Sequence, residues 1–225
     1  MPGNPEVVAR QSWQAVRGDL GRGRRAPSTA IEGLVLRMSG GGSRKPGLRV
    51  ADLSKAVAYA LRHEPWLFEL ELDALGWTSL DALVAGLRRE RCWDALTVED
   101  VEAMVASATK RRYEIHEGRI RALYGHSVPG RIVVVRGIPP AVLFHGTSPD
   151  AAEAIRTSGL RPMGRQYVHL SVDEATARAV GGRKASRPVI LTVAAGDAAS
   201  RGVVFYAGNE KVWLADQVPP DFITG

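Results

Sequence analysis

Cysteine is almost absent from this sequence, since Cys92 is the single one among 225 residues. One cysteine excludes an internal disulfide framework and a zinc site built from cysteines, and it suits the reducing cytosol. No apolar run approaches the roughly 18 residues of a membrane span. The first residues, MPGNPEVVARQSW, also lack the apolar core of a secretion signal. These absences predict a cytoplasmic protein without membrane segments.

The motifs of several common enzyme classes are also missing. There is no G-x-x-x-x-G-K-S/T loop, no G-x-G-x-x-G after a strand and no G-x-S-x-G turn. The histidines, at positions 63, 116, 126, 145 and 169, never fall at metal-ligand spacing on one helix. We therefore expect no P-loop kinase, Rossmann dehydrogenase, serine hydrolase or zinc enzyme.

Positive charge is concentrated at the N-terminus. The chain has 30 lysines and arginines against 24 acidic residues, and residues 1–50 contain nine of the former and three of the latter. The rest of the sequence is formally neutral, so an anion site there needs a local arrangement of arginines. We interpret the Gly/Arg/Pro-rich leader as a solvated, flexible extension, or as sequence upstream of a start at Met38. The alternative is an arm that binds nucleic acid.

Residues 51–137 are predicted to form a winged-helix-like lobe. Serine, threonine and aspartate ahead of periodic apolar residues mark the helix starts. The expected elements, in order, are a helix over 55–63 capped by Asp52 or Ser54 and ended by Pro65, a strand over 68–72, a turn at Gly76, a helix capped by Thr78 or Ser79, a helix after Thr97, and two strands around Glu117–Gly118. Three helices followed by a two-stranded wing is the winged-helix order.

Residues 138–225 are predicted to form a second lobe, in which short strands and helices are mixed. This lobe begins with a linker at Ile138–Pro140. Short β-rich runs alternate with capped helical segments. The expected elements are strands over 141–147, 167–171, 187–195, 202–208 and 211–215, a helix over 148–159 capped by Ser148 and closed by Gly159, and a helix over 173–183. The predicted fold class of the whole chain is α+β.

Short polar clusters stand beside these apolar segments. Two guanidiniums and an imidazole brought together would hold a phosphate through charge-assisted hydrogen bonds. Each cluster also has a structural interpretation, because an arginine can complement a helix dipole and a strand histidine can be a satisfied core residue. The clusters are Arg62-His63, Arg111-Arg112, Tyr124 to Ser127, His145 to Thr147, and Arg165 with His169 to Ser171. Their occurrence together favours a binding site.

The chain resembles the RNA 2'-phosphotransferase family in a series of segments: LSKAVAYALRHEP, LELDALGWTSLDALV, KRRYEI, RIRALYGHSVP, LFHGT, GRQYVHLS and VWLADQVPPDFI. The ordered combination of LRH, GHS, HGT and HLS is specific, whereas HGT alone occurs across ADP-ribosyltransferases. The resemblance covers about 53–223 and leaves out the leader. It implies a winged-helix-like RNA lobe over 51–137, followed by an ADP-ribosyltransferase-like lobe over 138–225 that binds NAD.

The resemblance also implies a reaction in two steps. An internal RNA 2'-phosphate attacks the anomeric carbon of the nicotinamide ribose of NAD, and nicotinamide leaves. The ribose 2''-hydroxyl then attacks phosphorus, which gives 2'-OH RNA and ADP-ribose 1'',2''-cyclic phosphate. Because the nucleophile is already an anion, the first step needs positioning and electrostatic stabilisation rather than a base. The implied partners are NAD as co-substrate and RNA with an internal 2'-phosphate, tRNA among the candidates, with no metal; a monomer is expected.

Residue roles follow from the same resemblance. Three arginines would hold the phosphate in both steps, and His63 would either bind phosphate or transfer a proton. Arg112 is preferred to Arg111 because the family's arginine precedes an aromatic residue, here Tyr113. The catalytic group is thus Arg62, His63, Arg112 and Arg165. The NAD pocket would be lined by His145, Gly146, Thr147, His169, Leu170 and Ser171, and the RNA would meet Arg119, Arg121, His126 and Ser127.

Two late positions bear on the identity of the acceptor. Many ADP-ribosyltransferases that modify proteins or DNA place a glutamate on a late strand, where this family has an aliphatic residue, here Val212. Glu210 is close by: as a loop acid it has no role, whereas in the pocket it would favour another acceptor. Phe205 or Tyr206 is expected to pack on nicotinamide. The alternative functions are an ADP-ribosyltransferase that caps nucleic-acid terminal phosphates and a non-catalytic winged-helix protein that binds nucleic acid.

Overall fold

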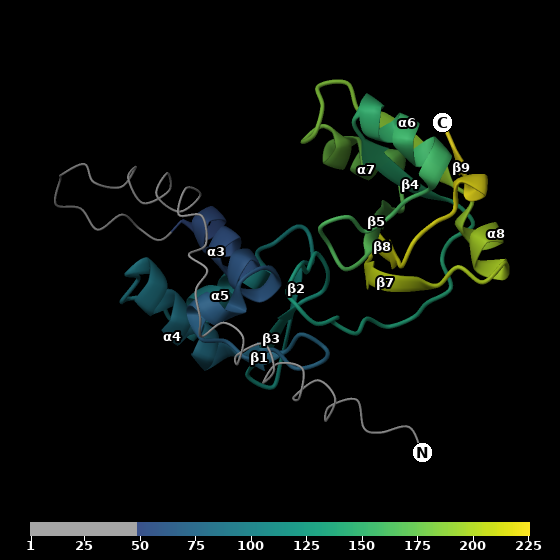
Figure 1. Cartoon of the computed structure of the whole chain (residues 1–225). Coiled ribbons are helices and arrows are strands. Elements are labelled where there is room, and N and C mark those ends of the chain that lie inside the picture. The colour runs from purple at the N-terminus through teal and green to yellow at the C-terminus, as the bar shows by residue number, and fades with distance from the viewer. Residues whose placement is uncertain (1–48) are drawn as a thin grey trace, which may run out of the picture.

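The computed structural model describes residues 49–225, so the predictions for residues 1–48 lie outside the described residues. The described chain forms two groups of elements, each built around its own sheet (Figure 1). Helices and strands alternate irregularly along the chain, and every strand pairing is antiparallel. The fold is therefore α+β, as the sequence predicted.

The N-terminal group packs three helices against a small sheet. Its helices are α3 (Val50–Arg62), α4 (Leu80–Arg91) and α5 (Val98–Ala106), and its strands β1 (Thr78–Ser79), β2 (Tyr113–His116) and β3 (Arg119–Ala122) lie in the order β1-β3-β2. Apolar residues three and four apart place one face of α3 in the core. That face consists of Leu53, Ala56, Val57, Ala60 and Leu61. The C-terminal end of α3 carries the polar side chains of Arg62 and His63.

The predicted start of the first helix is wrong. α3 begins at Val50 after Arg49, and no side chain caps it. Asp52 lies inside the first turn, where its carboxylate accepts a hydrogen bond from Arg49 Nε at 2.9 Å. An acid in the first turn stabilises the helix N-terminus without being the cap.

The predicted strand over 68–72 is also wrong. The chain forms a short 3-10 helix, η2 (Pro65–Phe68), and Glu69 then adopts a left-handed conformation with φ 54°. Proline favours the first turn of a helix, and the left-handed residue turns the chain before an extended run can form. Leu70 and Leu72 are nevertheless buried in the core of this group.

The remaining local predictions for the N-terminal group are confirmed. The side chain of Ser79 caps α4, and Thr97 forms a reciprocal capping box with Asp100 at the start of α5. Glu117 and Gly118, with φ of 47° and 69°, make the tight turn between β2 and β3. β1 adds to this sheet a third strand, which the sequence did not predict.

The C-terminal group is a six-stranded sheet with helices packed on it. Its strands are β4 (Leu143–Thr147), β5 (Val168–Ser171), β6 (Val189–Val193), β7 (Phe205–Asn209), β8 (Val212–Ala215) and β9 (Ile223–Thr224), in the order β7-β8-β5-β4-β6-β9. Its helices are α6 (Pro149–Ser158), α7 (Glu174–Gly181), α8 (Ala195–Ser200) and the 3-10 turn η3 (Pro220–Phe222). The predicted strands and two longer helices are confirmed, and Ser148 caps α6. The short elements α8, η3 and β9 were not predicted.

The segment between the two groups runs along the outer edge of the six-stranded sheet. Arg136 forms a β-bridge with Tyr206 of the edge strand β7, and the backbone N–H groups of Gly137 and Ala207 donate across the same boundary. Covering an edge strand in this way satisfies backbone groups that would otherwise invite pairing with another chain. The connection also fixes the two groups side by side.

Candidate active site

Arg62 occupies the last turn of α3, and its guanidinium lies between two aromatic rings. Its Cζ is 5.5 Å from the ring centroid of Tyr113 and 5.2 Å from that of Tyr124. Its Nη2 donates to the carbonyl oxygen of Arg112 at 3.5 Å, whereas its Nε is buried without a hydrogen-bond partner. Burial lowers the pKa of Arg62. A buried cation with an unused donor is suited to an anionic ligand.

His63, the next residue, is held by the chain that follows β3. Its Nδ1 is 2.8 Å from Ser127 Oγ, and the backbone N–H of Ser127 donates to the carbonyl oxygen of Arg62 at 2.8 Å. Burial lowers the pKa of His63, and the charges of Arg62 and Arg165 lower it further. The imidazole is thus oriented by Ser127 within a positively charged setting.

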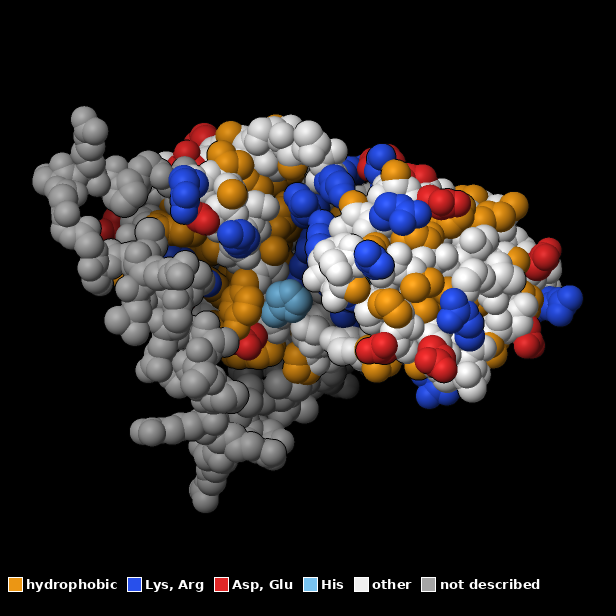
Figure 2. Space-filling view, turned by 90° about the horizontal axis from the view of Figure 1, so that it is seen from above, with side chains coloured by type: hydrophobic (Ala, Val, Ile, Leu, Met, Phe, Trp, Pro, Cys, Tyr) orange, Lys and Arg blue, Asp and Glu red, His pale blue; other side chains and the backbone are white. Residues whose placement is uncertain are grey.

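Arg112 and Arg165 bring two more positive charges to the same place. Arg112 precedes β2, Arg165 lies in the loop ahead of β5, and the charges of both lower the pKa of Arg62. The space-filling view shows lysine and arginine side chains gathered in the hollow between the two halves, with a histidine beside them (Figure 2). The four residues predicted as catalytic therefore converge on one positively charged site, which we call the cluster. They come from both halves of the described chain, that is, from the N-terminal and the C-terminal group.

Two histidines of the six-stranded sheet stand next to this cluster in defined tautomers. Nδ1 of His145 lies 3.0 Å from the carbonyl oxygen of His169, and Nδ1 of His169 lies 2.9 Å from that of Tyr167. Because a carbonyl oxygen only accepts, each Nδ1 carries the hydrogen and each Nε2 is a free acceptor. Burial, followed by the charge of Arg165, lowers the pKa of His169 to about 3. His169 Nε2 is buried without a partner, so it can accept a hydrogen bond from a ligand.

The sheet opens where these histidines lie. β4 and β5 are paired at one position, Phe144 with Ser171, and part beyond it, while β4 stays paired with β6 along its whole length. The imidazole of His145 bridges the parted strands. Ser171 is paired with Val212 of β8 on the other side. The parting of β4 and β5 therefore places the imidazoles of His145 and His169 in the middle of the sheet.

Two of the residues predicted to line the NAD pocket take part in the packing of the fold. A Cβ at Gly146 would lie 1.8 Å from the carbonyl oxygen of Ala177, so the packing of α7 on β4 requires glycine at this position. Leu170 is 1% exposed and belongs to the core, because alternation along β5 turns it away from His169 and Ser171. Thr147 is also buried.

The residues predicted to meet RNA are mostly engaged within the protein. Arg119 pairs with Asp73, with 2.6 Å between nitrogen and oxygen, and Arg121 donates to Glu114 Oε2 through two nitrogens at 2.8 and 2.6 Å. Both guanidiniums also lie over the ring of Trp77. Both arginines are thus held by acidic and aromatic side chains of the same half.

His126 and Ser127, which complete the RNA-facing prediction, separate in the structure. His126 is 3% exposed, and burial followed by the charge of Arg62 lowers its pKa to about 3. It is therefore a neutral residue beneath the cluster and does not offer a cation to RNA. Ser127 is exposed and, through His63, belongs to the cluster itself.

The remaining predictions from the sequence concern Glu210, Phe205 and Tyr206, near the C-terminal end of the chain. Glu210 is exposed in the turn between β7 and β8, where its carboxylate lies 3.8 Å from Arg111 of the other half. Phe205 is buried in the core, and the Tyr206 hydroxyl donates to Asp216 while its ring packs on that of Tyr167. Neither aromatic ring is therefore free to cover a nicotinamide.

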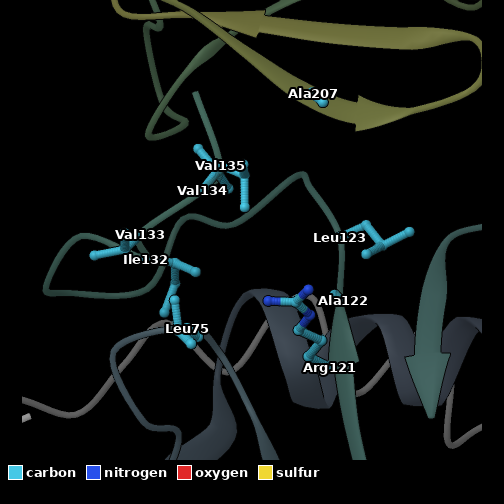
Figure 3. A pocket seen from close by; sticks show the side chains of 9 residues that line it. All are labelled: Leu75, Arg121, Ala122, Leu123, Ile132, Val133, Val134, Val135 and Ala207. Carbon is cyan, nitrogen blue, oxygen red and sulfur yellow. The ribbon is translucent and has the colours of Figure 1, made fainter. Parts of the chain in front are cut away.

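A separate small hollow lies under the connecting segment (Figure 3). It encloses about 40 Å³ and is lined by Leu75, Arg121, Ala122, Leu123, Ile132, Val133, Val134, Val135 and Ala207. That is far below the several hundred Å³ of a typical ligand pocket. Over residues 49–225 no group of three or more His, Cys, Asp or Glu side chains could hold a metal ion, and no helix of that range is long and apolar enough to cross a bilayer.

The sequence predicted no role for the aromatic and amide residues around the cluster, although Tyr124 begins one of the polar motifs. Tyr113 and Tyr124 flank Arg62, and Tyr124 also meets the ring of His169 edge-on, with centroids 6.1 Å apart. Asn209, at the end of β7, donates to the carbonyl oxygen of Arg111 at 2.6 Å and so ties the two halves together at the cluster. The position of both tyrosines in the sequence could have indicated their role, because Tyr113 directly follows Arg112 and Tyr124 directly precedes Gly125.

The fold and the site define an α+β protein with a positively charged site built by arginines from two halves. Residues 48–217 match the model of the family described as "RNA 2'-phosphotransferase, Tpt1 / KptA family". A probable RNA 2'-phosphotransferase of Bacillus thuringiensis is 52% identical over 172 residues, which cover 76% of this chain and 93% of that protein. Those of Acetivibrio thermocellus and Streptomyces griseus are 50% and 40% identical, over 77% and 78% of this chain and 95% and 96% of their own. The chain therefore belongs to the RNA 2'-phosphotransferase family.

Proposed function

We propose that this protein removes an internal 2'-phosphate from RNA and transfers it to NAD. A non-bridging phosphate oxygen attacks C1'' of the nicotinamide ribose, and the bond to nicotinamide breaks, so that an ADP-ribosylated 2'-phosphate forms. The 2''-hydroxyl of that ribose then attacks phosphorus and loses its proton, while the RNA 2'-oxygen leaves and takes one up. The products are 2'-OH RNA, nicotinamide and ADP-ribose 1'',2''-cyclic phosphate.

The observation that carries the proposal is the convergence of Arg62, Arg112, Arg165 and His63 around an unused buried donor. A phosphate dianion placed there would meet Arg62 Nε and the free guanidinium of Arg165. Arginine suits this task because it is planar, permanently charged and able to donate two parallel hydrogen bonds. Positioning of this kind accounts for most of the catalysis that a phosphoryl transfer requires.

The two histidines that lie where β4 and β5 part support the NAD half of the proposal. His169 Nε2 lacks a partner there and can accept a hydrogen bond from a ribose hydroxyl or the nicotinamide amide. The parted strands suit an ADP-ribosyltransferase-like lobe over 138–225, and three helices with a β-wing suit a winged-helix-like lobe over 51–137. The exposure of Glu210 and its pairing with Arg111 favour a phosphate acceptor over a protein acceptor.

We further propose that the RNA, with spliced tRNA as one candidate, lies across the hollow shown in Figure 2. The exposed free thiol of Cys92 agrees with a reducing, cytoplasmic setting. The protein is expected to act as a monomer, since residues from both halves of one chain build the cluster.

The proposal is tested with a short RNA that bears one internal 2'-phosphate, incubated with and without NAD and analysed by mass spectrometry. We expect NAD-dependent loss of the phosphate with release of nicotinamide and the cyclic phosphate. A lasting ADP-ribose adduct would identify a capping transferase instead. Binding of RNA without consumption of NAD would identify a binding protein.

The site assignment is tested with Arg62→Ala and Arg165→Ala. Removal of a preorganised donor costs on the order of 10²–10³ in rate. Arg201→Ala is the matched control, because Arg201 stacks on Phe222 beyond α8 and is not part of the cluster. Losses below about threefold in both cluster variants would overturn the assignment.

A further inference from the structure

Gln166, which follows Arg165, uses every hydrogen-bonding group of its side chain on one segment of the other half. Its Oε1 accepts from the backbone N–H of Ile132 at 2.9 Å. Its Nε2 donates to the carbonyl oxygens of Val128 and Gly130 at 2.9 and 2.7 Å. A glutamine amide with all its groups paired to backbone is a rigid connection.

The segment that Gln166 holds also orients the first half of the cluster. The backbone N–H of Gln166 donates to the carbonyl oxygen of His126 at 3.1 Å, and the adjacent Ser127 binds both His63 and the end of α3. A continuous series of hydrogen bonds therefore runs from Arg62 and His63, through Ser127 and the segment 126–132, to Gln166. In Figure 1 the loop ahead of β5 reaches from the six-stranded sheet toward the N-terminal group.

Arg165 depends on this connection because its own side chain has no partner among the described residues. Within residues 49–225 its guanidinium makes no hydrogen bond or ion pair, and its backbone N–H bonds only to Pro162 within the same loop, at 3.2 Å. The position of its charge is therefore set by the backbone of the loop. We infer that Gln166 is a positioning residue that sets the place of Arg165 relative to Arg62 and His63. This inference rests on the proposed function.

The two halves remain joined when Gln166 is changed, which keeps the test interpretable. The Tyr167 hydroxyl donates to the carbonyl oxygen of Ile132 at 2.8 Å and accepts from Arg131 Nε at 3.0 Å. Arg131 also pairs with Asp216. Loss of the Gln166 amide should therefore loosen the loop that carries Arg165 without separating the halves.

The test uses the full chain with Gln166→Ala and Gln166→Glu. The second variant keeps the shape and the Oε1 acceptor, but it turns the donor between two carbonyl oxygens into an oxygen. We expect both to slow loss of the RNA 2'-phosphate in a single turnover by roughly 10–100-fold, because a small misplacement of a catalytic group has that effect. The KM for NAD should be unchanged. Gln217→Ala, at an exposed position, is the matched control.

A double-mutant cycle separates positioning from a general structural role. If Gln166 acts through Arg165, adding Gln166→Ala to Arg165→Ala should lower the rate less than about threefold further. A loss as large as in the wild-type background would overturn the inference, and so would wild-type rates in both single variants.

A binding measurement distinguishes failure of this inference from failure of the proposed function. The probe is a labelled oligoribonucleotide with or without a 2'-phosphate, in the absence of NAD. We expect the wild-type chain to prefer the phosphorylated strand and Gln166→Ala to lose most of that preference. A preference kept by the variant overturns the inference alone, whereas a wild-type chain without preference overturns both.

Discussion

Gly146 offers a sharp test of how the sheet and α7 fit together. A Cβ added there would lie 1.8 Å from the carbonyl oxygen of Ala177 and 2.6 Å from its carbonyl carbon, both backbone atoms of α7. Alanine suits the backbone conformation, since Gly146 is not among the glycines with positive φ. Its substitution by alanine therefore acts through space alone.

The size of the effect follows from the geometry. Real Cβ atoms almost never approach another heavy atom within 3.0 Å, so α7 would have to move by more than one ångström. β4 cannot move instead, because it is an interior strand between β5 and β6. Overpacking of this kind costs about 1–3 kcal/mol, and a backbone obstacle places Gly146→Ala at the upper end. For a chain of this size that lowers the melting temperature by roughly 6–12 °C.

Thermal melting followed by circular dichroism measures the effect. Gly164→Ala is the control, because a Cβ at Gly164 meets nothing within 4 Å and should change stability by less than about 0.5 kcal/mol. If the two variants melted at the same temperature, the close packing of α7 on β4 would be refuted. Since His145 flanks Gly146, we also expect weaker NAD binding by Gly146→Ala.

Two further predictions concern the histidines. His126 and His169 have pKa values of about 3 in the fold, below the ordinary 6.5, so only the unfolded chain takes up protons as the pH falls below 6.5. Stability should fall from there toward pH 3, by about 2 kcal/mol per histidine at pH 5. Urea denaturation at pH 7.5 and 5 should show His126→Gln losing about 2 kcal/mol less than wild type; equal losses would contradict this. Ser127→Ala, which frees His63, should slow phosphate removal roughly tenfold, whereas Ser127→Thr keeps the hydroxyl and should restore the rate; wild-type rates in both would contradict the orienting role.

Local signals in the sequence predicted most of the elements, because they depend on neighbouring residues. The caps at Ser79, Thr97 and Ser148 and the turn at Glu117–Gly118 each need only a few adjacent side chains. The strand over 68–72 failed because its alternating leucines are buried by tertiary contacts in an irregular segment. Periodicity reports burial on alternate sides, which an extended loop between helices can also produce.

The site was harder to predict where roles depend on distant contacts. The side of β5 that faces the cluster could have been read from the alternation that sets Leu170 apart from His169. The packing role of Gly146 could not, because the obstacle belongs to α7, some thirty residues away. The contacts of Arg121 and the burial of His126 are also set by partners that only the fold brings near.

The charge of Arg62 leads to a final prediction: a substitution that removes this charge should lower the activity but not the stability of the fold. Desolvation is the largest cause that lowers the pKa of Arg62, ahead of the attraction of Tyr113 and Tyr124, so the folded state disfavours its charge. Arg62→Met, which fills the same space without charge, should leave the free energy of unfolding within about 1 kcal/mol of wild type or above it. Arg121→Met, by contrast, removes both hydrogen bonds to Glu114 Oε2, leaves Glu114 only the 3.3 Å contact of its Oε1 with Arg111, and should cost about 1–3 kcal/mol. Urea denaturation of both variants, with single-turnover rates for the first, measures this. If Arg62→Met were the less stable of the two, Arg62 would be a structural residue and the cluster would not be a site held ready for an anion.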